Sequence, residues 1–275
     1  MKIDKRKIIQ LTIGLLYNLH LVGFKDATIY TGELKKVCVP GLNCYSCPGA
    51  IAACPLGSLQ NQIMNAKGLN GIIVKFPFYI IGMLVLFGTI FGRVICGFLC
   101  PFGLIQELLY KIKSFKIRKN ELTRKLSAIK YIILALFVIA LPIVLNSPSF
   151  CKYICPAGTF EAGLTHVLLN EKLKNTIGFL FSWKVLIMVI IFVASIFIYR
   201  IFCRFICPLG AIYSFFNKVS ILGLKVDSAK CINCNACIDS CLMDVKKVGD
   251  RECIECGDCI KKCKCDAIYR IKKME

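Results

Sequence analysis

Long apolar stretches separated by basic loops dominate the sequence. Residues 8–24, 72–95, 128–145 and 183–199 are almost free of charge, and each comes close to the roughly 20 apolar residues that cross a bilayer as a helix. The first stretch contains Gln10, Asn18 and His20, but no small-residue cleavage site follows it, so we expect a span and not a signal peptide. The pattern predicts an α-helical polytopic membrane protein with about four transmembrane helices.

A short cysteine motif, which we call a corner, recurs along these stretches. Cys-Pro-x-Gly occurs four times, with its cysteines spaced by 46, 55 and 52 residues: Cys54, Cys100, Cys155 and Cys207. In the last three copies another cysteine stands four residues earlier: Cys96, Cys151 and Cys203. We therefore expect residues 1–222 to form an inverted-repeat-like membrane domain.

The chemistry of a corner suits an iron-sulfur cluster. Cysteines at positions i and i+4 share one face of a helix end. Proline fits the first position of the next helix, and the free amides of that helix start favour an anion. The simpler alternative is that these cysteines are small core residues. Four similar corners favour ligation.

The C-terminal part contains two runs of C-x2-C-x2-C-x3-C, the spacing of bacterial ferredoxins. The runs are Cys231, Cys234, Cys237, Cys241 and Cys253, Cys256, Cys259, Cys263. Because the fourth cysteine of each run ligates the other cluster in such proteins, we expect two [4Fe-4S] clusters. One would use Cys231, Cys234, Cys237 and Cys263, and the other Cys253, Cys256, Cys259 and Cys241. Residues 223–275 are thus predicted to form an α+β two-cluster ferredoxin-like domain.

Two details of these runs depart from the ferredoxin pattern. The proline that usually follows the fourth cysteine is replaced by Leu242 and Lys264, and Cys265 is an additional thiol that could replace Cys263. A zinc site is a weaker interpretation, because it would leave the third and fourth cysteine of each run without a role.

Composition agrees with a membrane protein rich in metal ligands. Hydrophobic residues make up 57% of the 275 positions, charged residues 19%, and mean hydropathy is +0.67, which is too apolar for an ordinary soluble domain. The net charge of +20 lies beside the apolar runs, which favours cytoplasmic loops facing anionic lipid over nucleic-acid binding. Nineteen cysteines in such a chain favour metal ligation over disulfides.

Basic residues also predict the sidedness of a cell-membrane, multi-pass protein. Residues 1–7, 93–130 and 200–275 hold 27 Lys and Arg, against 9 in 25–75 and 148–184. The positive-inside rule therefore places the N terminus and the ferredoxin-like domain in the cytoplasm.

This sidedness sorts the corner cysteines into two sets. The cytoplasmic face would gather one complete cluster site: Cys96, Cys100, Cys203 and Cys207. The opposite face would hold candidate ligands of a second site: Cys44, Cys47, Cys54, Cys151 and Cys155, with Cys38 nearby. Disulfides remain an open alternative on that face, which is oxidising.

These motifs resemble a known family. The segment 42–48, the corners 96–103, 151–158 and 203–210, and the two ferredoxin runs resemble membrane-bound polyferredoxin-like 4Fe-4S binding proteins. That family is related to the quinol dehydrogenase membrane subunit of periplasmic nitrate reductase and to the membrane half of nitrous-oxide-reductase accessory proteins. The resemblance implies an integral membrane electron-transfer protein, but it fixes neither partner nor quinone site.

The expected function is an electron relay. Electrons would pass between a cytoplasmic donor, such as a ferredoxin or flavoprotein, and a quinone or exoplasmic acceptor. The alternative is a redox-sensing or assembly factor for another metalloenzyme. No catalytic residues can be named, and the two histidines, His20 and His166, are too few for paired haem ligation at more than one site. We expect an electron-carrier subunit of an oxidoreductase system, with any flavin held by a partner.

Overall fold

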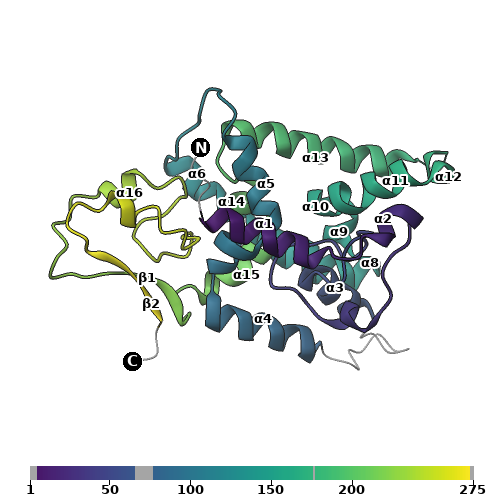
Figure 1. Ribbon diagram of the computed structural model, residues 1–275, viewed down its shortest axis with the longest axis horizontal. Coiled ribbons are helices and arrows are strands. Elements are labelled where there is room, and N and C mark those ends of the chain that lie inside the picture. The colour runs from purple at the N-terminus through teal and green to yellow at the C-terminus, as the bar shows by residue number, and fades with distance from the viewer. Residues whose placement is uncertain (1–4, 66–76, 176, 273–275) are drawn as a thin grey trace.

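The computed structural model describes residues 5–65, 77–175 and 177–272 (Figure 1). The first part of the chain is helical: α1 (Lys5–Tyr17), α2 (Val22–Asp26), η1 (Glu33–Lys36), α3 (Pro55–Asn65), α4 (Phe78–Phe91), η2 (Ile95–Leu99), α5 (Pro101–Tyr110), α6 (Glu121–Leu126), α7 (Ile129–Ile133), η3 (Leu134–Ala140) and α8 (Leu141–Leu145). The helical region continues with α9 (Ser149–Tyr153), α10 (Pro156–Gly158), η4 (Thr159–Leu164), α11 (Thr165–Leu169), α12 (Glu171–Lys174), α13 (Phe179–Phe197), α14 (Ile201–Phe205) and α15 (Pro208–Phe216). The C-terminal segment contains β1 (Leu222–Val226), α16 (Ala236–Asp239), η5 (Ile260–Lys262) and β2 (Ile268–Lys272).

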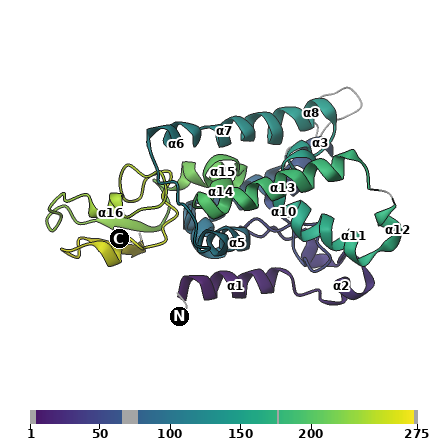
Figure 2. The same cartoon turned by 90° about the horizontal axis from the view of Figure 1, so that it is seen from above.

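Three long helical segments give the helical region its shape. They are α4, the continuous helix Glu121–Leu145 built from α6, α7, η3 and α8, and α13. Both views place α3 toward one end of α13, and α14 and α15 toward the other (Figures 1 and 2); Figure 1 shows α9 on the same side as α3. The short helices that carry the corners therefore gather at two separate places.

Each corner starts a helix as its sequence predicts. Helices α3, α5, α10 and α15 begin at Pro55, Pro101, Pro156 and Pro208. The cysteine before three of these prolines has extended backbone, as the residue before a proline prefers. The thiols of Cys155 and Cys207 accept hydrogen bonds from the amides of Gly158 and Gly210, both at 3.4 Å.

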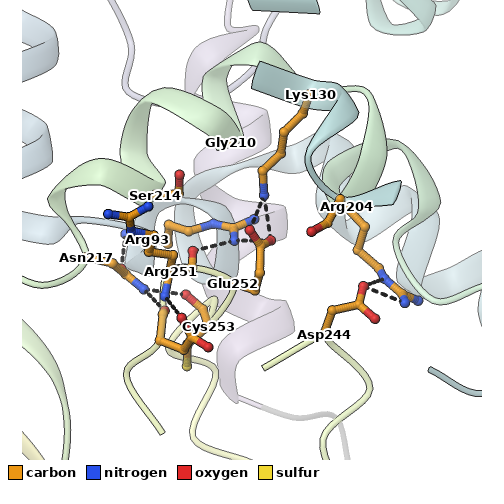
Figure 3. Close-up of polar contacts among 12 residues, drawn as sticks. Arg93, Lys130, Arg204, Gly210, Ser214, Asn217, Asp244, Arg251, Glu252 and Cys253 are labelled. Carbon is orange, nitrogen blue, oxygen red and sulfur yellow. Dashed lines mark hydrogen bonds and ion pairs between the residues drawn. The ribbon is translucent and has the colours of Figure 1, made fainter. Parts of the chain in front are cut away.

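The C-terminal segment packs on the helical region through buried ion pairs (Figure 3). Glu252 accepts from Lys130 at 2.5 Å and from Arg93 at 3.0 Å, and Arg204 pairs with Asp244 at 2.6 Å. A buried carboxylate needs such partners. The cations of Arg93 and Lys130 lower the pKa of Glu252 although burial would raise it.

Backbone contact brings the same two parts together at one corner. A Cβ atom at Gly97 would collide with the carbonyl oxygen of Ile254 and would lie 3.9 Å from the amide nitrogen of Cys256. Glycine is thus required where η2 meets the loop between Cys253 and Cys256.

The prediction of about four transmembrane helices is wrong. Among the described residues, only Glu121–Leu145 and Phe179–Phe197 are long and apolar enough to cross a membrane. The expected span 72–95 contains α4, which at 14 residues is about 21 Å long against a bilayer core of about 30 Å. Residues 72–76 lie outside the described part.

The expected span 8–24 is also wrong, for a different reason. It divides into α1 and α2, and α1 buries two polar side chains. Gln10 donates to the carbonyl oxygen of Cys100 at 3.1 Å, and Arg6 to that of Gly97 at 3.2 Å. Because these groups bind a corner, α1 packs along the protein with its polar side inward.

The α+β description of the C-terminal segment is wrong as well. Its described part has one two-stranded antiparallel sheet, in which Leu222 pairs with Lys272 and Val226 with Ile268. Apart from α16 and η5, the chain between the strands is loop and turn. The proposed division at residues 222 and 223 stays a prediction, although β1 begins there.

Candidate iron-sulfur sites

Four cysteines from two corners form what we call the buried site. They are Cys96, Cys100, Cys203 and Cys207, each 6% to 8% exposed. Burial, and then the charges of Cys203 and Cys96, raise the pKa of the Cys100 thiol to about 12. Burial and the charges of the other three thiols likewise raise the pKa of Cys207. The four cysteines belong to one buried cluster of side chains, and a bound metal would have to replace the protons of their thiols.

A glutamine connects the two corners of the buried site. Gln106, on α5, donates from Nε2 to the Cys203 sulfur at 3.1 Å. Its Oε1 accepts from the backbone amide of Phe202 at 3.0 Å. Both ends of the amide are thus used, and the side chain is completely buried.

Two completely buried arginines flank the buried site. Arg200 donates to the Cys96 carbonyl oxygen at 2.5 Å and to Glu107 at 2.9 Å. Arg93 donates to Glu252 and, at 2.8 Å, to the Arg251 carbonyl oxygen. Burial would raise the pKa of Glu107, but the charges of Arg200 and Arg6 lower it to about 2.

Four other cysteines line a cavity of about 300 Å³ that we call the open site: Cys44, Cys54, Cys151 and Cys155. Cys44 and Cys151 are partly exposed, whereas Cys54 and Cys155 are buried. Burial and the charges of Cys54 and Cys44 raise the pKa of Cys151 to about 12. The structure therefore brings together four of the five candidate ligands expected on this side.

The fifth, Cys47, does not line this cavity, and neither does Cys38. Both are buried free thiols. Among the described cysteines, no disulfide is formed.

The open site has its own glutamine and one buried acid. Gln60, on α3, donates to the Cys151 sulfur at 3.3 Å and accepts from the Phe150 amide at 3.0 Å. Glu161 accepts from the Cys44 amide at 2.5 Å. Burial raises the pKa of Glu161 to about 7, and the Cys44 amide lowers it only in part.

Two further cavities in the C-terminal segment match the expected ferredoxin grouping. One of about 170 Å³ is lined by Cys231, Cys234, Cys237, Cys263 and Cys265. The other, of about 80 Å³, is lined by Cys241, Cys253, Cys256 and Cys259, with Tyr199 of the helical region beside them. The fourth cysteine of each run thus lies with the other run. The Cys263 and Cys265 sulfurs are 3.7 Å apart, so either can face the first cavity.

Cysteine thiols make up all four groups. Within the described ranges, no three His, Cys, Asp or Glu side chains converge closely enough to hold one metal ion. Thiolates are the ligands that iron-sulfur clusters require, and a cluster is larger than an ion, so its ligands stand farther apart. The donor set therefore suits a cluster at each group, and three of the four groups line a cavity. Ligation by the individual cysteines stays a prediction.

Sequence reasoning missed the glutamines and the arginines, yet both leave a positional signal. Gln60 and Gln106 are each the sixth residue after the corner cysteine that precedes proline, and Glu161 occupies the same position in the third corner. Arg93 and Arg200 each stand three residues before the first cysteine of a corner in the buried site. The repeated spacing therefore indicates these positions, but it does not indicate which atoms the side chains contact.

Comparison with known proteins adds an independent result. A family model described as a 4Fe-4S binding domain matches residues 76–120, 128–176 and 180–226, about half of the chain. No solved structure matches.

Several curated proteins are also similar. Two uncharacterized proteins of Methanocaldococcus jannaschii are 31% and 35% identical to the chain, in each case over 70% of it and over 65% and 74% of their own lengths. The regulatory protein NosR of Stutzerimonas stutzeri is 30% identical over 55% of the chain, which spans only 20% of that protein. A putative electron transport protein, YccM of Escherichia coli, is 23% identical over 57% of the chain and 43% of its own length. The corners, the cysteine groups that they form and these matches together show that the chain belongs to the 4Fe-4S binding domain family.

Proposed function

We propose that this chain is an integral membrane iron-sulfur protein that passes electrons along four cysteine groups. A [4Fe-4S] cluster bound at each group would take up and release one electron. The observation that carries the proposal is that one short segment joins the open and buried sites and that the buried site contacts the C-terminal segment. The order would be the open site, the buried site and then the two C-terminal groups. The first of these, the Cys241–Cys259 group, consists of Cys241, Cys253, Cys256 and Cys259. The second, the Cys231–Cys263 group, consists of Cys231, Cys234, Cys237 and Cys263, with Cys265 beside them.

One short segment joins the open and buried sites. A Cβ atom at Gly41 would lie 3.2 Å from Cα of Cys100 in the buried site, and Cys44 lines the open site. Gly41 and Cys44 are three residues apart, so their Cα atoms are at most about 11 Å apart. Electron tunnelling falls steeply with distance, and so short a connection favours transfer.

The buried site also contacts the C-terminal segment directly. Gly97, next to Cys96, meets Ile254, which follows Cys253. Tyr199, which lines the adjacent cavity, precedes Arg200 of the buried site. The Cys241–Cys259 group is therefore the natural neighbour of the buried site, and the group with Cys231 is the outermost.

Exposed apolar helices favour a place in the membrane. In each of Glu121–Leu145 and Phe179–Phe197, only 17% of the most apolar 18-residue stretch is buried inside the protein. In water such surfaces would be costly, whereas lipid covers them. Fourteen Lys and Arg in 200–275 and nine in 93–130, against four in 148–184, favour a cytoplasmic C-terminal segment.

We propose one class of redox partner for each end of this path. A cytoplasmic ferredoxin or flavoprotein would exchange electrons at the C-terminal segment, and a quinone or exoplasmic acceptor at the open site. The names of two relatives, putative electron transport protein and regulatory protein, correspond to the two functions considered: electron relay, which we favour, and redox regulation.

Iron content and EPR on anaerobically purified protein test the proposal. We expect Cys96→Ser and Cys151→Ser each to remove one cluster, about four iron atoms, and a different EPR signal. Cys38→Ser is the matched control, because Cys38 is buried but lies outside the open-site cavity. Unchanged iron and spectra in both corner variants would overturn the proposal.

A further inference from the structure

The buried site has an electrostatic problem that the open site does not share. Four thiolates and a cluster carry net negative charge, and reduction adds one more. Removing that charge from water is unfavourable, and each buried-site cysteine is at most 8% exposed. Without compensation, the reduced state would be strongly disfavoured.

Arg200 places a positive charge beside this site. Its Nη1 would lie 3.0 Å from a Cβ atom at Gly103, the glycine of the second corner. An arginine guanidinium keeps its charge in proteins, and Arg200 donates to Glu107 at 2.9 Å. The guanidinium is thus fully buried, charged and in contact with the second corner through the Cys96 carbonyl oxygen and Gly103.

Arg93 lies against the glycine of the other corner of the buried site. Its Nη2 would lie 3.6 Å from a Cβ atom at Gly210, the glycine of the fourth corner. Its Nε and Nη2 have no hydrogen-bond partner among the described groups, although the side chain is completely buried. Each arginine thus lies against the glycine of the opposite corner.

Nearby carboxylates do not cancel these charges. Glu107 binds both Arg200 and Arg6, and Glu252 binds both Arg93 and Lys130. Each carboxylate is therefore shared by two cations. The surroundings of the buried site keep a positive balance.

The open site lacks this arrangement. Pro148 stands at the position that Arg93 and Arg200 occupy before their cysteines. Lys152 and Lys184 line the cavity, but Lys152 is exposed and Lys184 is only half-buried, so solvent screens them. The glycines of the two corners there, Gly57 and Gly158, face Tyr45 and Cys44.

We propose that the charges of Arg93 and Arg200 raise the reduction potential of the buried site. They thereby keep the site reducible although it is buried in the protein. The inference rests on the proposed function, because it requires a cluster at Cys96, Cys100, Cys203 and Cys207. One electron enters from the neighbouring reduced group, no proton is transferred, and the two guanidinium charges stabilise the added negative charge.

Redox titration of the full chain, followed by EPR, tests this proposal. The signal of the buried site is identified as the one lost in Cys96→Ser. We expect Arg93→Gln and Arg200→Gln each to lower the equilibrium constant for its reduction at least tenfold, which is about 59 mV for one electron. Arg93→Lys and Arg200→Lys, which keep the charge, should stay much closer to the wild-type potential.

Arg204→Gln is the matched control. Arg204 is also buried beside Cys203, but Asp244 neutralises it in a one-to-one pair, so its loss should shift the potential far less. A glutamine variant that loses the cluster while the lysine variant keeps it at the wild-type potential would support the charge requirement. A buried-site signal with unchanged potential in both glutamine variants would overturn the inference and leave the proposed function standing. Absence of any signal that Cys96→Ser removes would instead overturn the proposed function.

Discussion

The buried and open sites are built from the same corner, yet they differ in what surrounds the sulfurs. Each has a glutamine that donates to one cysteine sulfur and accepts from the preceding phenylalanine amide, Gln106 in one and Gln60 in the other. Buried arginines flank the first site, whereas the second opens into a cavity and has Glu161.

This difference shows how a repeated motif can be specialised without changing its ligands. The shared glutamine fixes the geometry of two corners relative to each other. The residue three positions before the cysteine then sets the charge, arginine where the site is sealed and proline where it is open. Burial and charge thus change together, as the energetics of a buried anion require.

The largest expected effect is a loss of stability on replacing Glu107, beside the buried site, compared with Glu161, beside the open site. Glu107 binds Arg6, Arg200 and Tyr199, so Glu107→Gln should destabilise the protein by about 3 to 5 kcal/mol at neutral pH, because two buried cations lose their partner. Glu161 accepts one backbone hydrogen bond that a glutamine oxygen could also accept, so Glu161→Gln should cost much less. Anaerobic thermal unfolding followed by circular dichroism measures both.

The Glu107 effect should also depend on pH. Its pKa is about 2 in the folded protein, below the usual 4.5, so its contribution is fully present above about pH 4.5 and is lost as the pH falls toward 2. The difference in unfolding free energy between wild type and Glu107→Gln should therefore shrink over that interval. A difference that grows on acidification would contradict the assigned ion pairs.

A smaller effect is expected at the contact between the buried site and the C-terminal segment. Gly97→Ala places a methyl group against the Ile254 carbonyl oxygen, which should cost about 1 to 3 kcal/mol and slow electron transfer from the buried site to the Cys241–Cys259 group. Gly82→Ala is the control, since a Cβ atom there meets nothing within 4 Å. Flash reduction with EPR detection compares the two rates; equal rates would argue against transfer at this contact.

The smallest effect is expected from replacing the glutamine of each site, and it should be similar at the buried and open sites. Gln106→Leu and Gln60→Leu each remove one hydrogen bond to a cysteine sulfur, which is worth about 1 kcal/mol, and such bonds contribute to cluster potentials. We expect the potential of the buried site to fall in Gln106→Leu and that of the open site in Gln60→Leu. If either variant shifted the other site instead, the assigned contacts would be wrong.

The sequence predicted local features well and long-range ones poorly. Cysteine followed by proline predicted the start of a short helix, and α3, α5, α10 and α15 begin there, because proline fits the first turn and the geometry is local. The two ferredoxin runs predicted which cysteines share a cavity, since that exchange is a property of the motif.

Span number could not be predicted from hydropathy alone. Arg6 and Gln10 donate to the corner carbonyl oxygens of Gly97 and Cys100, and these partners lie about 90 residues away in the sequence. The same limit applies to Gln60 and Gln106: their positions repeat in the sequence, but their partners lie about 90 to 100 residues away.

The most direct test of the electron path is transfer across a sealed vesicle. The full chain would be reconstituted with the C-terminal segment outside, a membrane-impermeant reductant added outside, and an impermeant oxidant enclosed, with an ionophore present to balance charge. We predict that wild-type protein reduces the enclosed oxidant and that Cys96→Ser does not, although its C-terminal groups are still reduced. Reduction of the oxidant at the same rate by Cys96→Ser, or none by wild-type protein whose four groups are all reduced, would contradict the account.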